Sequence, residues 1–206
     1  MKVGIVCAFD TYFDRVALLK EFYQKRAQVK VIASDFSHRK KEKNRESSLV
    51  DEWIDTKPYH KNLSVARLTS HYDFSKKAEK LLEAETWDVL HVFVPCNSLV
   101  KFMALIKHKQ PKTKLIFDLI DLWPETMPIS KFKNVFPFTL WKQIRDKDLD
   151  QADLIFTECK LYQQVLQKED NEKYKVLYWA RQEKPLESHL QIKYTELSFC
   201  YLGSMN

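Results

Sequence analysis

The chain has 206 residues, of which 45% are hydrophobic and 30% charged, and its formal net charge is +6. This length fits one α/β domain, or one domain and part of another. No apolar run approaches the ~20 residues of a membrane-spanning helix, and the sequence turns polar at Asp10, too early for a secretory signal. With only Gly4 and Gly203, it has no glycine-rich phosphate-binding loop.

The positive charge predicts attraction to an anionic partner, such as nucleic acid, membrane headgroups or a phosphorylated substrate. No recognisable nucleic-acid-binding motif accompanies it, so we expect no nucleic-acid partner. The four cysteines are widely spaced, which predicts reduced, packed thiols in the cytosol and no zinc site. They are Cys7, Cys96, Cys159 and Cys200. We expect no metal and no cofactor.

Strand-like apolar runs alternate with segments of helical spacing from residue 2 to about residue 179. The alternation is typical of βαβ units and predicts an α/β fold, a Rossmann-like doubly wound parallel sheet. Residues 38–48 are expected to form a basic surface loop, and 49–68 one or two short strands. Strands are expected at 2–9, 28–34, 88–94, 114–120, 154–157 and 176–179, and helices at 14–25, 74–84 (with Ser75 as N-cap), 97–108, 140–150 and 161–167.

The domain organisation follows from the same pattern. Residues 1–181 are expected to form one Rossmann-like domain, and the polar segment 182–196, which carries Pro185, a linker. Residues 197–206 form a new apolar run with a turn at Gly203. We interpret this run as the first strand of a second domain that is otherwise absent.

The end of the predicted strand 114–120 is the first site candidate. Asp118, Asp121, Trp123 and Glu125 crowd together there, and in open α/β sheets ligands bind beyond the carboxyl ends of the strands. A carboxylate at this place can accept the hydrogen bond of a reacting hydroxyl or stabilise developing positive charge. Alternatively, Asp118 binds backbone amides, Glu125 is a solvated loop residue, and Trp123 packs into the core rather than against a sugar.

The connection between the first strand and the first helix is the second candidate. Thr11, Tyr12 and Arg15 lie in it. Amides at a helix start attract phosphate, and an arginine adds a forked donor for a diphosphate. Alternatively, Asp10 or Thr11 caps the helix and Arg15 is solvated.

Residues 131–145 alternate aromatic and basic side chains, the pattern of a helix that lies on a membrane surface. The alternative is an aromatic-rich turn packed in the core. The basic run 39–45 extends this surface or forms a solvated loop. The residues expected to contact the membrane are Phe136, Phe138, Trp141, Lys142 and Arg145.

Residues 117–125, Phe-Asp-Leu-Ile-Asp-Leu-Trp-Pro-Glu, resemble the acidic Asp-Leu-Trp-Pro-Glu signature of bacterial family 4 glycosyltransferases. Segments 61–74, 152–158 and 201–204 are similar to neighbouring parts of those enzymes. The resemblance implies the N-terminal half of a GT-B architecture, in which two Rossmann-like domains face each other across a cleft. The chain departs from the family at 8–15, where a glycine-rich turn is usual.

The resemblance also implies an activity. Family members are retaining, metal-independent enzymes that transfer a sugar from a nucleotide-sugar donor, often to a polyprenyl-diphosphate-linked acceptor for capsule or other cell-surface polysaccharide. The N-terminal domain receives the lipid-linked acceptor at the anionic inner face of the plasma membrane. The chain is therefore expected to be cytoplasmic and peripheral, and to be inactive without a donor domain or partner subunit.

On this basis Asp121 and Glu125 are the expected catalytic residues. The expected acceptor-binding residues are Asp118, Trp123, Thr11, Tyr12, Arg15 and Arg67. Arg67 and the nearby His71 have a plainer alternative as a salt-bridged arginine and an ordinary surface histidine. A different class of function also fits the sequence: a non-catalytic module that docks to a membrane or an acceptor beside a separate donor subunit.

Overall fold

The computed structural model describes residues 1–127 and 135–180. The predicted linker 182–196 and the strand predicted at 197–206 lie outside the described residues, as does the first part of the aromatic and basic segment. Everything that follows concerns the described part of the chain.

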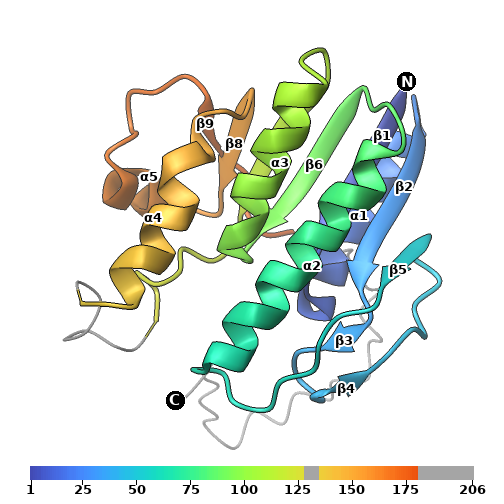
Figure 1. Ribbon diagram of the computed structural model, residues 1–206. Helices are drawn as coiled ribbons and strands as arrows, with labels where there is room; N and C mark the ends of the chain where they lie inside the picture. Colours follow the sequence, from blue (N-terminus) through green and yellow to red (C-terminus); the bar gives the residue numbers. More distant parts are fainter. Residues whose placement is uncertain (128–134, 181–206) are drawn as a thin grey trace, which may run out of the picture.

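Within the described residues, seven parallel strands form one sheet in the order β5-β2-β1-β6-β7-β8-β9 (Figure 1). The chain starts in the middle of the sheet, builds outward to β5, and returns across β1 to build the other half. This order confirms the predicted Rossmann-like doubly wound α/β fold. The strands are β1 (Lys2–Cys7), β2 (Gln28–Ser34), β5 (Glu52–Ile54), β6 (Val89–Val94), β7 (Lys114–Leu119), β8 (Leu154–Thr157) and β9 (Tyr174–Val176).

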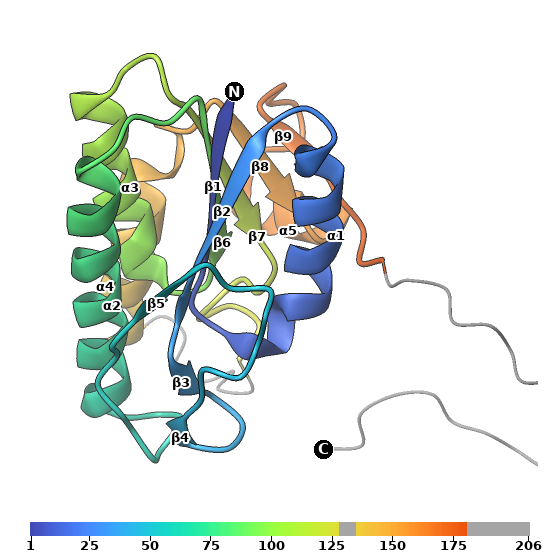
Figure 2. The same cartoon turned by 90° about the vertical axis from the view of Figure 1, so that its right-hand side faces the viewer.

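Helices cover both faces of this sheet, with α2, α3 and α4 side by side on one face and α1 on the other (Figure 2). Both faces are thereby shielded, as an all-parallel sheet requires. No helix in 1–127 or 135–180 has the length and apolar character to cross a bilayer. The helices are α1 (Phe13–Gln24), α2 (Val65–Glu83), α3 (Asn97–Lys109), α4 (Phe138–Leu149) and α5 (Lys160–Leu166), with a 3-10 turn η1 (Asp10–Tyr12) before α1.

The start of α2 was predicted wrongly. The helix begins at Val65 rather than near residue 74, and its N-cap is Ser64, whose hydroxyl oxygen accepts the amide of Arg67 at 3.2 Å. Ser75 lies inside the helix and donates to the carbonyl of His71. The buried face of the first turns carries Arg67, Ser70 and His71, so the hydrophobic spacing that marks a helix is missing there.

The prediction of a basic surface loop at 38–48 was also incomplete. It contains one strand of a short antiparallel pair, β3 (Phe36–Ser37) and β4 (Glu42–Lys43). The buried carboxylate of Asp35 holds this loop, since it accepts from Lys43 at 2.7 Å and from Arg45 at 2.9 Å. Residues 39–45 are thus an anchored loop rather than a freely solvated one.

Gly4 lies in β1 between β2 and β6, where the backbone passes close to the side chain of Leu90, its partner on β6, and to the ring of Trp87. A Cβ at this position would lie 2.8 Å from Leu90 Cδ2 and 3.1 Å from the ring of Trp87. The close approach, rather than an unusual backbone angle, requires glycine here.

We predict that Gly4→Ala destabilises the protein by about 1–3 kcal/mol, because the added methyl overpacks the core. Alanine in an ordinary strand interior would instead stabilise relative to glycine. Urea unfolding would measure the difference, with Lys112→Ala on the exposed surface as the control. A midpoint for Gly4→Ala equal to or above the wild type would contradict the prediction.

Candidate functional site

The site candidate lies at the carboxyl ends of the strands, at the lower edge of the sheet in Figure 1. β1 and β6 are neighbours there, although they are far apart in sequence. In open α/β sheets this reversal of strand order is where ligands bind. The segments that leave β1, β6 and β7 bring the predicted residues of 9–15 and 118–125 together.

Asp121 is one of the predicted site residues that keep exposed surface. Its side chain is half-buried just past β7, and one of its oxygens accepts a hydrogen bond from the hydroxyl of Tyr12 on η1. Burial and the charge of Asp121 raise the pKa of the Tyr12 phenol, so the hydroxyl stays protonated and donates. The other carboxylate oxygen accepts no hydrogen bond from the described residues.

Glu158 is a second acidic residue at this site, and the sequence analysis missed it. It follows β8, the strand paired with β7, and its backbone amide donates to the carbonyl of Leu119. Burial, reinforced by the charge of Asp121, raises the pKa of the Glu158 carboxyl above its usual value. Its place directly after an apolar run was the signal in the sequence.

Asp118 and Arg15 form a buried ion pair instead of contacting a ligand. The guanidinium donates to both carboxylate oxygens, at 2.8 and 2.9 Å, and the Asp118 side chain has no exposed surface. The predicted acceptor-binding roles of the two residues are therefore corrected, because neither is open to an acceptor. The alternatives failed as well: Arg15 is not solvated, and Asp118 binds a guanidinium rather than backbone amides.

The ion pair is the centre of a wider buried network. Arg15 also donates to the carbonyls of Leu177 and Tyr178, which follow β9. On the other side, His91 Nε2 lies 3.4 Å from Asp118, and His91 Nδ1 lies 3.0 Å from the hydroxyl of Tyr23. These contacts connect α1, β6, β7 and the chain beyond β9 through one carboxylate.

Glu125 is held by Arg145, which corrects two predictions at once. The buried guanidinium of Arg145 donates to both oxygens of Glu125, at 2.8 and 2.9 Å, and to the carbonyl of Trp123. Arg145 therefore faces inward rather than toward a membrane, and the geometry gives Glu125 a loop-positioning role rather than the expected catalytic one. It is not the solvated acid of the alternative either.

The stability contributed by the Glu125–Arg145 pair depends on pH in a defined direction. Burial alone would raise the pKa of Glu125, but hydrogen bonds from Arg145 outweigh it and hold this pKa below the usual glutamate value. A lowered pKa means that the contact contributes stability above about pH 4.3. The contribution is lost as the pH falls through the lowered pKa.

Trp123 is half-buried and lies at a junction of aromatic and cationic groups. The guanidinium of Arg67 lies 4.2 Å from its ring centroid, and the ring of Trp141 lies 5.9 Å away. Asn97, at the start of α3, donates to the carbonyls of both tryptophans. The indole packs against the core and still keeps part of its surface exposed.

Arg67 and His71 are buried neighbours on α2, with an Arg67 Nε to His71 Nε2 distance of 3.4 Å. The expectation of an ordinary surface histidine is therefore wrong for His71, and none of the described carboxylates forms a salt bridge with Arg67.

Thr11 is half-buried, and neither it nor Asp10 caps the helix. Asp10 instead accepts a hydrogen bond from Ser37 at 2.6 Å.

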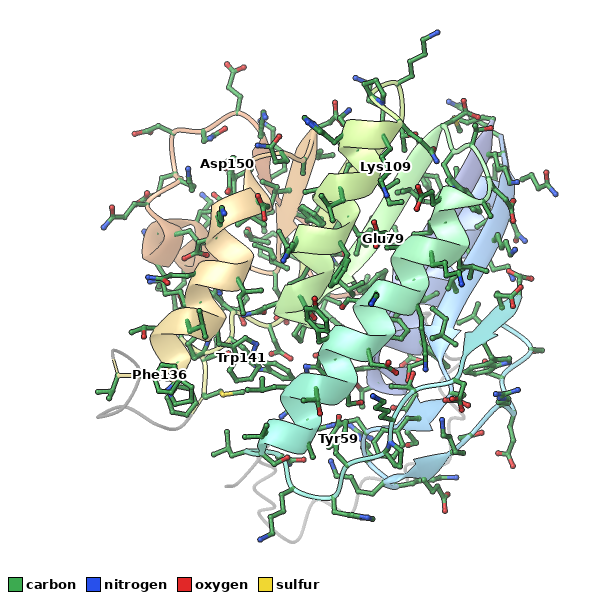
Figure 3. All side chains as sticks on the ribbon, in the orientation of Figure 1. Tyr59, Glu79, Lys109, Phe136, Trp141 and Asp150 are labelled. Carbon is green, nitrogen blue, oxygen red and sulfur yellow. The ribbon has the colours of Figure 1, made fainter. Side chains whose placement is uncertain are left out.

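An apolar groove separates the start of α2 from the start of α4, with a cavity of about 230 Å³. Trp141 lies between the two helices and is buried, whereas Phe136 at the outer end of α4 is 75% exposed (Figure 3). Phe138 and Lys142 are half-buried. Of the predicted membrane contacts, Trp141 belongs to the packed interior. The groove is lined by Asn62, Leu63, Ser64, Val65, Leu68, Pro137, Phe138 and Trp141.

Among the described residues, no cluster of histidine, cysteine, aspartate or glutamate has the arrangement of a metal site.

Comparisons with known proteins give structural matches alone. No family model matches the sequence, and no curated protein matches it. The UDP-GlcNAc 2-epimerase of Methanocaldococcus jannaschii is 14% identical, with a TM-score of 0.52, and the match covers 88% of this chain and 46% of the epimerase. The Neisseria meningitidis UDP-GlcNAc 2-epimerase bound to UDP-GlcNAc is 14% identical, with a TM-score of 0.52 and coverage of 85% and 45%.

A further UDP-N-acetylglucosamine 2-epimerase reaches a TM-score of 0.55 at 15% identity, covering 85% of this chain and 47% of that one. The chain thus spans about half the length of the structures it matches. At such low identity the likeness shows the fold, a Rossmann-like unit of the GT-B type, and nothing about the reaction.

We predict that Asp118→Asn lowers the free energy of unfolding by about 3–5 kcal/mol, because it leaves the buried guanidinium of Arg15 without a counter-charge. Urea unfolding would measure it, with the exposed Asp14→Asn as the control. Replacing both partners, Arg15→Met with Asp118→Leu, should cost less than the sum of the two single changes. Additive losses would show that the two residues do not act as a pair.

Proposed function

We propose that the chain is the acceptor-side unit of a GT-B enzyme that uses a nucleotide sugar, and that it serves transfer of the sugar to a lipid-linked acceptor. The observation that carries the proposal is Asp121. It is a half-buried carboxylate at the end of β7, oriented by Tyr12, inside the Asp-Leu-Trp-Pro-Glu segment that resembles retaining glycosyltransferases.

In such a transfer, an acceptor hydroxyl oxygen bonds to the anomeric carbon while the bond from that carbon to the donor phosphate breaks. The nucleoside diphosphate leaves, and the hydroxyl proton must be accepted. Asp121 supplies an oxygen for that proton, because Tyr12 occupies the other one and fixes the carboxylate. Glu158, whose raised pKa brings it closer to neutrality, is a nearby group that can exchange the proton with solvent.

The groove between α2 and α4 supports a lipid-linked acceptor. Its walls are mostly apolar, and exposed apolar side chains extend it outward at Val65 (76% exposed) and Phe136. With the half-buried Lys142 beside them, these groups fit an anionic membrane surface, apolar side chains at the acyl boundary and a cation at the headgroups. We therefore propose a peripheral position on the inner face of the membrane, with Phe136, Phe138 and Lys142 as contacts.

The donor would be bound by a second domain or a partner subunit. The matched epimerases are about twice as long as the match, and one of them is bound to UDP-GlcNAc. UDP-GlcNAc is therefore the first donor to test. We expect the chain by itself to be inactive.

A second candidate is a non-catalytic docking module. It is favoured because several predicted site residues are engaged in ion pairs within the fold. Asp118 is paired with Arg15, and Glu125 is paired with Arg145. Sugar transfer or nucleotide-sugar hydrolysis that depends on Asp121 would rule this function out.

We predict that Asp121→Asn, in the complete enzyme with its donor domain, lowers kcat by about 10²-fold or more, because proton acceptance is lost. The fold should stay intact, since Asp121 is only half-buried. Radiolabelled sugar transfer would measure the rate, and Asp14→Asn on the exposed surface of α1 is the matched control. Unchanged turnover would show that Asp121 is not a catalytic residue.

We predict that Phe136→Glu weakens binding to vesicles that contain anionic lipid by roughly tenfold, because a charge replaces an aromatic ring at the acyl boundary. Phe22→Glu, at an exposed aromatic residue of α1, is the control and should bind as the wild type does. Vesicle co-sedimentation would measure both. Equal binding by the two variants would contradict a membrane surface at α4.

A further inference from the structure

Arg67 is a buried cation without a counter-ion among the described residues. Its side chain is 3% exposed, Nη1 donates to the carbonyl of Asn62, and Nη2 has no hydrogen-bond partner. Aromatic rings surround the guanidinium, with Trp123 at 4.2 Å and Phe9 and Tyr59 each at 5.9 Å from it. Burying a charge in this way is costly unless a partner of opposite charge offsets it.

Three further nitrogen-bearing side chains lie beside Arg67. His71 is 5% exposed and its Nδ1 is unpartnered. His38 Nδ1 lies 2.6 Å from the hydroxyl of Tyr59 and 3.4 Å from Lys41 Nζ. Lys41 Nζ also donates to Asn62 Oδ1 at 2.6 Å and lies 4.8 Å from the Tyr59 ring centroid. The β3–β4 turn thus brings His38 and Lys41 up to the two buried donors on α2.

The basic side chains of this cluster have lowered pKa values. Burial and the charges of Arg67 and Lys41 lower the pKa of His38 to about 4. Burial and the charge of Arg67 also lower the pKa of Lys41 and of His71. Asp10 acts on His38 in the opposite direction; its Oδ2 accepts from Ser37, and its buried Oδ1 has no hydrogen-bond partner among the described residues. Each positive charge is therefore disfavoured, first by burial and then by its cationic neighbours, and a bound anion would act in the opposite direction.

We propose that Arg67, His71, His38 and Lys41 form a binding site for a diphosphate group. Arg67 Nη2 and His71 Nδ1 are buried nitrogens without a hydrogen-bond partner, and His38 and Lys41 lie beside them, so the cluster matches the charge and the acceptor oxygens of that group. The inference deepens the proposed function, on which it rests only for the identity of the molecule that carries the diphosphate.

The surroundings favour a diphosphate with an apolar tail. Arg67 bonds to Asn62 and to the N-cap Ser64, and both residues line the α2–α4 groove. Its guanidinium stacks on Trp123, whose ring contacts Trp141 in the wall of the groove. Phe9 and Tyr12, with ring centroids 6.0 Å apart, continue from the other side of Arg67 toward Asp121. Apolar groove, cation and carboxylate thus follow one another in space.

Binding requires one wall of the cluster to move. The cavity lined by Tyr59 and His71 has a volume of about 10 Å³, room for roughly one water molecule. Asp35 anchors this loop through Lys43 and Arg45, which follow the turn, and α2 and the strand ends are packed into the core. The wall left to give way is therefore the tip of the turn, from His38 to Lys41. Lys41 adopts a left-handed backbone conformation, φ 60°, which is strained for a residue with a side chain.

The test measures thermal stability of the whole chain with increasing pyrophosphate in phosphate-free buffer. A ligand that binds the folded state raises the melting temperature, so we expect pyrophosphate to stabilise the wild type. Arg67→Met should bind pyrophosphate roughly tenfold or more weakly, because charge-assisted hydrogen bonds are lost. In the absence of anion it should melt at or above the wild-type temperature, because an uncompensated buried charge has been removed.

A second pair of variants keeps the test decisive if Arg67→Met does not fold. Lys41→Met should weaken pyrophosphate binding, whereas Lys40→Met, its exposed neighbour, should not. Two results would each overturn the proposal: no stabilisation of the wild type by pyrophosphate, or equal stabilisation of Lys41→Met and Lys40→Met.

Two further ligands identify the source of the diphosphate. Farnesyl diphosphate should bind more tightly than pyrophosphate, and Val65→Glu in the groove should remove that gain. Tighter binding of UDP than of farnesyl diphosphate would support the anion site and assign it to the nucleotide. Anion binding that persists in Asp121→Asn, while transfer is lost, separates this site from the proposed reaction, so either can fail without the other.

Discussion

The buried ion pair between Arg15 and Asp118 is the interaction on which the site depends. It joins the first helix to the central strand β7 and also holds the backbone that leaves β9. Arg15 lies in the first turn of α1, directly after η1, so the pair fixes the position of η1 over the strand ends. Tyr12 on that turn then reaches Asp121. Two charges in the core thereby set the geometry of a carboxylate that neither of them contacts.

The ionisable residues at the strand ends fall into two groups with different energetics. Asp118 with Arg15, and Glu125 with Arg145, are bidentate pairs whose opposite charges offset each other's desolvation. Asp121 lies beside Glu158, and Arg67 beside His38 and Lys41, so like charges are brought together. Burial and then the charge of Asp121 raise the pKa of Glu158, and burial and then the charge of Arg67 lower the pKa of His38 and of Lys41. The first group stabilises the fold. In the second group the charged forms are disfavoured, and ionisable residues perturbed in this way are concentrated at functional sites.

Much of the fold could be predicted from the sequence because its parallel strands are buried on both faces and so appear as apolar runs. β2 and β8 match their predicted bounds for this reason. The start of α2 could not be predicted, because Arg67, Ser70 and His71 occupy its buried face. Pairings such as Arg15 with Asp118, 103 positions apart, depend on the tertiary fold, and no local pattern distinguishes a paired carboxylate from an open one. Asp121 and Glu125 look equivalent in sequence, and only the position of Arg145 on α4 separates them.

The short turn η1 has a consequence for the coupling of the two proposed sites. Asp10 at its start faces the side of His38, and Tyr12 at its end holds Asp121. With one residue between them, the two cannot move independently. An occupant that displaces the β3–β4 turn pulls on Ser37 and hence on Asp10, and the pull reaches the hydroxyl that aligns the carboxylate. Occupancy of the proposed anion site and alignment of Asp121 would thereby be coupled through the three residues of η1.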